Sequence, residues 1–218
     1  MGIGVAGAVV ILAAVTSLTA YFLGCFNGAV IVSKYFLHDD VRKHGSGNAG
    51  LTNFYRKFGP RLAVVVLACD MLKAILAVAI GGAVFGHFFG NVLSGQYWAG
   101  LFCLVGHMFP CMFHFKGGKG VLSGGAIALM IDWRVALAVW GIFLIMFLLT
   151  RYVSLGSVCA AILYAVSTAV TFGSAGLTVL ASLSGALIVW QHRENLSRLF
   201  RGQERKFHFH REKDRKEE

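Results

Sequence analysis

The chain has 218 residues, of which 57% are hydrophobic and only 14% are Asp, Glu, Lys or Arg. Because a soluble domain has about 25% charged residues, this composition excludes an ordinary water-soluble enzyme and predicts an integral membrane protein. The net charge of +10 does not indicate nucleic-acid binding, since basic residues that flank membrane spans meet anionic lipid headgroups.

Apolar segments that are long enough, or nearly long enough, to cross a bilayer recur along the chain. A crossing helix needs about 20 consecutive apolar residues. The first segment lacks the basic start of a secretory signal and is longer than the apolar part of one, so we expect a retained span. The six clear segments are residues 3–24, 62–85, 97–113, 134–150, 155–171 and 174–191.

The distribution of Lys and Arg predicts which connections face the cytoplasm, because basic connections favour the inside. The connections 86–96 and 172–174 contain no Lys or Arg and suit the outside. The basic and therefore cytoplasmic positions are the 34–61 connection, Lys116, Lys119, Arg151 and the tail after residue 191.

The six clear segments alone do not satisfy these positions, and residues 119–132 are the candidate for a further crossing. About 14 residues give only about 21 Å of helix, so this span is tilted or re-entrant. We therefore predict an all-α membrane protein with seven transmembrane helices, the N-terminus outside and the C-terminus in the cytoplasm. Five crossings, with residues 119–150 forming a re-entrant hairpin, satisfy the same pattern. Residues 1–206 form a single membrane domain, and residues 207–218 are a charged tail that we expect to be disordered.

The first polar connection is rich in glycine and in neutral hydrogen-bond donors. Three glycines within six residues let backbone N–H groups turn toward one point, as in phosphate-binding nests. Arg56 adds a planar fork that suits a phosphate face. A flexible loop with no ligand is the alternative. The residues concerned are Gly45, Ser46, Gly47, Asn48, Gly50, Thr52, Asn53 and Arg56.

The second polar connection carries Gly117 and Gly118 between Lys116 and Lys119, directly before the short apolar segment. The start of a helix carries about half a positive charge and several free N–H groups, and Lys119 adds a full charge there. The spacing of a P-loop is absent, so a nucleotide-binding domain is not expected. A basic anchor at the lipid headgroups is the alternative.

Two further polar clusters lie at predicted cytoplasmic span ends. Arg151 to Ser157 includes Arg and Tyr residues that are ordinary interface anchors. In the cluster from Gln191 to Arg198, His192 and Asn195 are three residues apart and share a helix face. A phosphate-rich site at the cytoplasmic surface indicates an enzyme of lipid headgroups or an anion transporter.

Within the second span, Asp70 and Lys73 are intramembrane charges and are therefore functional candidates. They are three residues apart, so they can neutralise each other on one helix face, and we favour a structural pair, or a pair that supports site residues, over a catalytic role. The five cysteines lie in apolar segments without Cys-x-x-Cys spacing, so we expect buried thiols and no metal site.

The chain resembles the bacterial glycerol-3-phosphate acyltransferases that use acyl-phosphate as donor, the PlsY family. The motifs that carry the resemblance occur in the family's order and cover the chain nearly end to end. They are Gly45-Ser46-Gly47-Asn48 with Gly50, Thr52-Asn53 and Arg56; Gly106-His107 with Pro110 and Phe115 to Gly120; Arg151 to Leu155 with Ser157; and His192 to Asn195 with Arg198-Leu199 and Gly202.

The resemblance implies transfer of a fatty acyl group from acyl-phosphate to the 1-hydroxyl of glycerol 3-phosphate, which gives lysophosphatidic acid and phosphate. It implies a seven-helix enzyme of the bacterial inner membrane with a cytoplasmic site. It implies no cofactor, no metal and no acyl-CoA. The expected partners are the two substrates, the lipid bilayer and a soluble enzyme that supplies acyl-phosphate, with no nucleic acid.

The resemblance also implies roles for individual residues. Cys25, Asn27 and Leu51 depart from the family pattern, and these departures concern the first helix and the acyl groove. The residues that would hold the phosphate of acyl-phosphate are Ser46, Gly47, Asn48, Thr52, Gly117 and Gly118; those that would hold glycerol 3-phosphate are Arg56, Lys119, Ser157, His192 and Asn195. Lys119, His192 and Arg56 are the candidate catalytic residues.

The fate of the hydroxyl proton has two candidate solutions. His192 is the obvious protein base, whereas the resemblance implies that the substrate phosphate takes the proton. A transporter of a phosphorylated anion is the alternative to an enzyme. Transporter sites usually lie near the midplane between repeated halves, and the chain has its phosphate candidates at the cytoplasmic face and no internal repeat.

Overall fold

The computed structural model describes residues 4–208, and every long element in this range is a helix. The predicted all-α fold is confirmed for these residues. The helices are α1 (Val5–Cys25), α2 (Gly28–Ile31), α3 (Leu51–Phe58), α4 (Pro60–Phe89), α5 (Val92–Met108), α6 (Val121–Ile131), α7 (Trp133–Thr150), α8 (Val153–Phe172), α9 (Ala175–Gln191) and α10 (Arg193–Phe200), with short turns η1 (Val32–Phe36), η2 (Val41–Lys43) and η3 (Cys111–Phe113).

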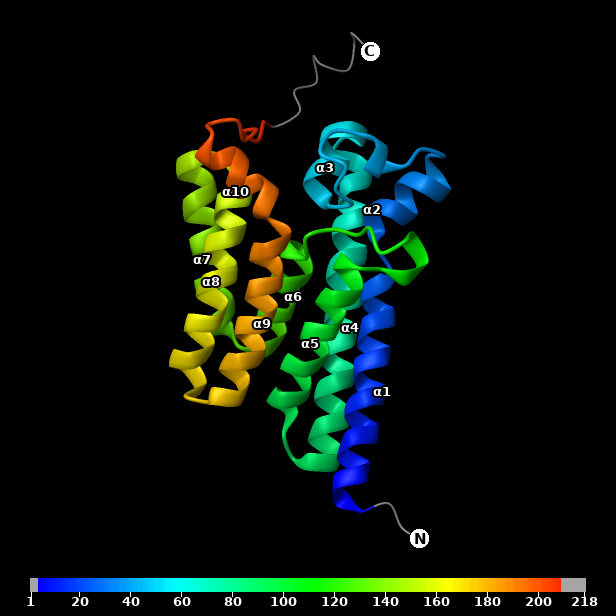
Figure 1. Ribbon diagram of the computed structural model, residues 1–218, viewed down its shortest axis with the longest axis vertical. Coiled ribbons are helices and arrows are strands. Elements are labelled where there is room, and N and C mark those ends of the chain that lie inside the picture. Colours follow the sequence, from blue (N-terminus) through cyan, green and yellow to red (C-terminus); the bar gives the residue numbers. More distant parts are fainter. Residues whose placement is uncertain (1–3, 209–218) are drawn as a thin grey trace.

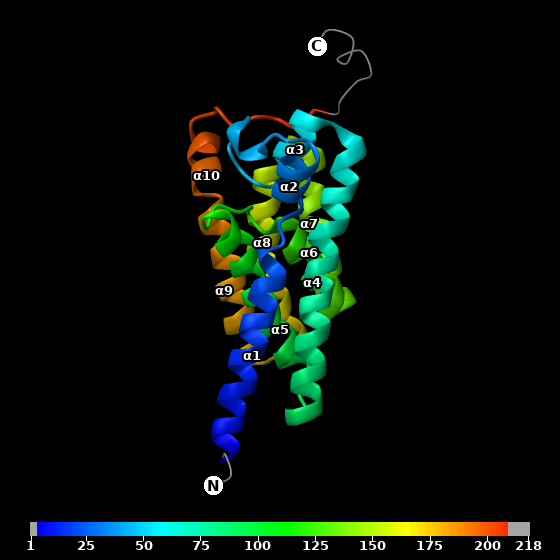
Figure 2. The same cartoon turned by 90° about the vertical axis from the view of Figure 1, so that its right-hand side faces the viewer.

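The long helices form two groups, which are joined by the short helix α6 and by the packing of α5 on α9. Helices α1, α4 and α5 pack together, α8 packs on both α7 and α9, and α6 packs on α4, α5 and α7. Figure 1 shows α6 in the middle of the molecule between these groups. The short helices α2, α3 and α10 lie at the end of the bundle opposite the N-terminus (Figure 2).

Each of the seven predicted apolar segments forms a helix. By length and composition, α1, α4, α7 and α8 are able to cross a membrane, and α9 with α10 makes a fifth if this pair, bent by 57°, is taken as one span. Helix α5 has 17 residues, and α6 has only 11. At 1.5 Å per residue, α6 is about 16 Å long, so it is shorter than the predicted 119–132 segment.

The position of α5 differs most from the prediction. Residues 97–113 were expected, but the helix runs from Val92 to Met108. It starts early because the Asn91 side chain accepts a hydrogen bond from the N–H of Ser94 at 3.0 Å, which caps the first turn. It ends early because Pro110 disfavours helical geometry in the residue before it. The apolar residues that follow enter η3 instead.

Glycine residues let the backbones of α5 and α1 approach closely. A Cβ on Gly24 would overlap the carbonyl oxygen of Cys103, and one on Gly106 would overlap that of Tyr21. Helices in lipid associate through such close backbone approach, since lipid tails are as apolar as the side chains. The last turn of α5 is therefore held rigidly against α1.

The predicted pairing of Asp70 and Lys73 is confirmed. Their side chains lie 2.7 Å apart and are almost completely buried in α4. Lys73 also donates to the carbonyl oxygen of Phe26 at 2.9 Å, and the N–H of Gly28 donates to Asp70 at 3.3 Å. The Ser123 hydroxyl of α6 donates to the Asp70 carbonyl oxygen at 3.1 Å. The pair lies on α4 and thus holds together three parts of the structure: the break between α1 and α2, helix α4, and helix α6.

Candidate active site

A cavity of about 660 Å³ lies among α3, α4, α6, α7, α8 and α10. Most of the residues predicted for substrate binding line it, although they come from four separate parts of the sequence. Gly47, Gly117 and Gly118 do not line the cavity in the described chain. The predicted residues that do are Ser46, Asn48, Thr52, Arg56, Lys119, Ser157, His192 and Asn195.

Four described helices begin at this cavity. Residues of the first turns of α3, α6, α8 and α10 lie on its wall. A helix N-terminus carries about half a positive charge and N–H groups without helical partners, so each favours an anion. Four such ends around one cavity make it a strongly anion-attracting site. These first-turn residues are Leu51 and Thr52, Val121 and Leu122, Val153 and Ser154, and Asn195.

Basic side chains add to this positive field. Burial lowers the pKa of the Arg56 guanidinium, and the charge of Arg205 acts in the same direction. Burial also lowers the pKa of Lys119 to about 8, and the charge of Arg198 contributes. An anion bound between these cations would offset their repulsion. The described residues include no group of three His, Cys, Asp or Glu side chains placed to hold a metal ion.

One hydrogen-bonded chain fixes the polar wall on the α8–α10 side. Asn195 accepts from Lys119 and donates to Glu204 at 2.6 Å. Glu204 also accepts from Ser154 and from Arg198, both at 2.8 Å. Burial raises the pKa of the Glu204 carboxyl, but the hydrogen bonds lower it more, so the pKa lies below its usual value. The carboxylate therefore stays charged and orients Asn195 toward Lys119.

Glu204, Ser154 and Arg198 also belong to the site. Ser154 and Arg198 lie in the polar clusters identified from the sequence but were given no role there, and Glu204 was not identified. Glu204 is an acidic residue in an otherwise mostly basic segment, and this is the signal that could have found it. From the sequence alone, a single carboxylate among basic residues is equally consistent with a solvated surface residue and with a site residue. Only the fold brings it into contact with Asn195.

His192 is buried at the junction of α9 and α10. Its Nδ1 lies 2.8 Å from the carbonyl oxygen of Ile188. A carbonyl only accepts hydrogen bonds, so Nδ1 carries the hydrogen and Nε2 of the neutral ring is an acceptor. This tautomer suits a contact with a substrate hydroxyl.

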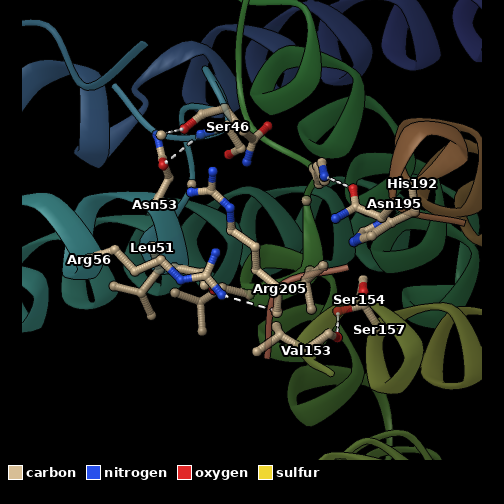
Figure 3. Close-up of a pocket in the computed structure, with 18 of the residues that line it drawn as sticks. Ser46, Leu51, Asn53, Arg56, Val153, Ser154, Ser157, His192, Asn195 and Arg205 are labelled. Atoms are coloured by element: carbon tan, nitrogen blue, oxygen red, sulfur yellow. Dashed lines mark hydrogen bonds between the residues drawn. The ribbon is translucent and has the colours of Figure 1, made fainter. Parts of the chain in front are cut away.

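The first glycine-rich loop is closed by Asn53. The Asn53 amide nitrogen donates to the carbonyl oxygens of Val41, His44 and Asn48 at 3.0–3.1 Å, and its oxygen accepts the N–H of Ser46 at 3.2 Å. Asn53 therefore shapes the loop, which leaves the neighbouring polar side chains to face the cavity. Figure 3 shows Ser46, Asn53 and Arg56 on one side of the cavity and Ser157, His192 and Asn195 on the other.

The second loop uses its glycines for packing. The N–H of Gly117 donates to the carbonyl oxygen of Met108, and the N–H of Gly118 donates to that of His107, each at 3.1 Å. A Cβ on Gly117 would overlap the His107 carbonyl oxygen. The loop thus folds tightly onto the end of α5 and delivers Lys119 to the cavity.

One side of the cavity is apolar. Helices α4, α6 and α7 supply this side, and Leu67 is partly exposed on the outer face of α4. A ligand that combines an anionic group with an alkyl chain fits such a cavity. The apolar lining residues from these three helices are Leu67, Val121, Leu122, Trp140 and Phe143.

The sequence matches the family described as glycerol-3-phosphate acyltransferase over residues 14–202. The chain belongs to the glycerol-3-phosphate acyltransferase family. It is 34% identical over 194 residues to the glycerol-3-phosphate acyltransferase of a Thermoanaerobacter species, a match that covers 89% of this chain and 95% of the relative. It is 38% identical over 191 residues to that of Pseudomonas putida, with 88% and 97% covered.

A solved structure of an acyltransferase from this family has the same fold. The crystal structure of PlsY (YgiH), an integral membrane glycerol 3-phosphate acyltransferase in its glycerol 3-phosphate form, matches with a TM-score of 0.81 and 34% identity. The match covers 90% of this chain and 96% of that chain. The lysophosphatidic acid form of PlsY matches with a TM-score of 0.78. The predicted resemblance to the PlsY family is confirmed, and the chain is an integral membrane acyltransferase.

We predict that the charge of Lys119 controls the alkaline limb of the acyltransferase pH profile. Because its pKa is about 8, kcat/KM should fall as pH rises through about 8 and the ammonium group loses its proton. Lys119→Met should lower kcat/KM at neutral pH by about 10- to 150-fold, since a charge-assisted contact is lost. Lys119→Arg should move the alkaline fall to higher pH.

The matched control is Lys116→Met, which removes an exposed lysine of the same loop that does not line the cavity. It should leave the pH profile unchanged. A folded Lys119→Met variant with wild-type kcat/KM at neutral pH would contradict the placement of Lys119 in the substrate site.

Proposed function

We propose that the protein transfers a fatty acyl group from acyl-phosphate to the 1-hydroxyl of sn-glycerol 3-phosphate, giving lysophosphatidic acid and inorganic phosphate. The observation that carries this proposal is one cavity with four helix N-termini and several cations at its polar side and an apolar side between α4, α6 and α7. Both substrates carry phosphate, and one carries an alkyl chain. The matching structures of PlsY are a glycerol 3-phosphate form and a lysophosphatidic acid form of that protein.

The two substrates are assigned to opposite sides of the cavity. Ser46, Asn48 and Thr52 line it beside the N-terminus of α3 and would hold the phosphate of acyl-phosphate. Gly47, Gly117 and Gly118 support this site through the shape of the two loops. The residues proposed to hold glycerol 3-phosphate are Arg56, Lys119, Ser157, His192 and Asn195.

In the reaction, the 1-hydroxyl oxygen attacks the carbonyl carbon of the mixed anhydride, and the bond from that carbon to the phosphate oxygen breaks. Two phosphates close together repel each other. Fixed cations and helix ends that stabilise charge without reorganising reduce this repulsion and stabilise the leaving phosphate. Lys119 and Arg56 are the side chains proposed for this task.

We assign the base to the phosphate of glycerol 3-phosphate, with His192 orienting this substrate. Burial lowers the pKa of His192 to about 4, and the charge of Lys119 acts in the same direction. The imidazolium ion that a protein base would form is therefore disfavoured. The second pKa of a phosphate monoester is about 6, so the phosphate of glycerol 3-phosphate is the better acceptor of the 1-hydroxyl proton. Nε2 of His192 is then left to accept a hydrogen bond from the neighbouring 2-hydroxyl.

The activity is tested with purified protein supplied with acyl-phosphate and glycerol 3-phosphate. Lysophosphatidic acid and inorganic phosphate should appear in equal amounts, and neither should form without the acceptor. Replacing acyl-phosphate by acyl-CoA is the matched control and should abolish the product. Turnover with acyl-CoA at a similar rate would overturn the donor assignment. Uptake of glycerol 3-phosphate into proteoliposomes without acylation would favour the transporter alternative.

The source of the base is tested with an acceptor whose phosphate is a methyl diester. The diester keeps one negative charge but has no oxygen that takes a proton near neutral pH. It should inhibit competitively against glycerol 3-phosphate and yet not be acylated. Acylation of the diester at a rate near that of glycerol 3-phosphate would move the base to the protein, with His192 as the first candidate.

We further propose that the chain crosses the bacterial inner membrane seven times, with the N-terminus outside and the active site facing the cytoplasm. A soluble enzyme that makes acyl-phosphate would then supply the donor. The seven apolar helices and the basic residues around the cavity support this orientation. Residues 209–218 of the predicted tail lie outside the described residues, while Phe207 at its start packs on Tyr55 and Phe147.

The orientation predicts different chemical access at the two ends of the bundle. In a Cys-free variant, Ser94→Cys at the start of α5 should react with an impermeant thiol reagent added to intact cells. Ser197→Cys in α10 should react only after the membrane is opened. The reverse labelling pattern would contradict the proposed orientation.

A further inference from the structure

His107 is a buried residue of the cavity wall to which the proposed reaction gives no role. It lies in the last turn of α5 and is 3% exposed. The neighbouring Gly106 presses against the backbone of α1, so the position of the ring is fixed. A buried polar ring at a cavity needs partners for both of its nitrogens.

The Nδ1 atom of His107 is already occupied. Lys73 lies 2.8 Å from it, and an ammonium group only donates hydrogen bonds. Lys73 forms an ion pair with Asp70 at 2.7 Å and has two hydrogen-bond partners, the carbonyl oxygen of Phe26 at 2.9 Å and Nδ1. Nδ1 therefore accepts, and the neutral ring of His107 carries its hydrogen on Nε2. This is the opposite tautomer to that of His192.

The Nε2–H group has no hydrogen-bond acceptor within residues 4–208. It lies between the two glycine loops, because a Cβ on Gly118 would overlap Nε2 and would stand 2.7 Å from the carbonyl oxygen of Ala49. The N-terminus of α6 and Lys119 line the same cavity. A donor at this point adds to an anion-attracting surface.

We propose that Nε2–H of His107 donates a hydrogen bond to a phosphate oxygen of acyl-phosphate, and that Lys73 and Asp70 position the ring by fixing its tautomer. This inference rests on the proposed function. It gives Gly118 a physical reason to be glycine although its own N–H is bound to α5, since any side chain there would cover Nε2. The buried Asp70–Lys73 pair then serves the site as well as the helix packing.

The tautomer and the contact are tested in the wild-type protein by NMR of ¹⁵N-labelled histidine. The probe is a non-hydrolysable acyl-phosphonate, and the His107 signal is the one that His107→Gln removes. This signal should have the shift of a neutral Nε2–H ring and should move when the phosphonate binds. His87, exposed at the far end of α4, should not respond. An Nδ1–H ring, or a signal that stays in place while that of His192 moves, would overturn the inference.

Kinetics separate a binding role from a structural one. His107→Phe keeps the ring volume without a donor and should lower kcat/KM for acyl-phosphate by about 10- to 100-fold. The KM for glycerol 3-phosphate should stay within about twofold. His107→Gln should recover much of the loss, because its amide accepts from Lys73 and still donates. His87→Phe is the matched control and should be fully active.

Equal effects on both substrates with a lowered thermal midpoint, or a His107→Gln variant no better than His107→Phe, would assign His107 to packing alone. If the phosphonate does not inhibit the wild-type enzyme competitively with acyl-phosphate, the proposed donor is wrong. That failure is distinct from failure of the His107 contact.

Discussion

The structure depends on one electrostatic constraint, the meeting of positive helix ends and basic side chains around a single cavity. The N-termini of α3, α6, α8 and α10 each favour an anion there, and Lys119 and Arg56 add full charges. Such an arrangement repels itself at low dielectric. Glu204 offsets part of the repulsion through its contacts with Asn195 and Arg198, and a bound phosphate would offset more.

This constraint accounts for the irregular helices. A bundle of full-length spans would leave its helix ends at the membrane surface, far from the apolar groups that an acyl chain needs. Helix α6 is short because it begins at the cavity, below the level of α3 and α10 (Figure 1). The loop before it is held down by the bonds of Gly117 and Gly118 to the end of α5. The break between α1 and α2 is fixed in turn by Lys73 and Asp70.

Hydrophobic segments were predictable from the sequence because lipid exposure requires long apolar runs. Arg56, Lys119, His192 and Asn195 were identified as members of polar clusters at the span ends, and the resemblance to the PlsY family singled them out within these clusters. The limits of α5 were not, since hydropathy reports burial in lipid while capping by Asn91 and the effect of Pro110 decide where the helix lies. The proposed roles of these residues stay predictions.

The partners of backbone and buried polar groups were beyond the sequence. The sequence predicted that the N–H groups of Gly117 and Gly118 are free to bind phosphate. In the structure these N–H groups donate to carbonyl oxygens at the end of α5, which the sequence does not indicate. Asp70 and Lys73 were predicted to pair with each other, because residues three apart on a helix lie on the same face. Their link to His107 joins residues 34 positions apart and no local pattern encodes it.

The two helix groups are also held together across the cavity by the segment that follows α10. The carbonyl oxygen of Arg205 accepts from Arg56 at 3.4 Å, and Glu204 binds the opposite wall. The N–H of Phe207 donates to the Arg151 carbonyl oxygen at 2.8 Å, while its ring packs against α3 and α7. Residues from both walls thus depend on one short segment for their position. Local loosening of this segment would free Arg56 and Asn195 together, so the polar half of the site forms as a unit.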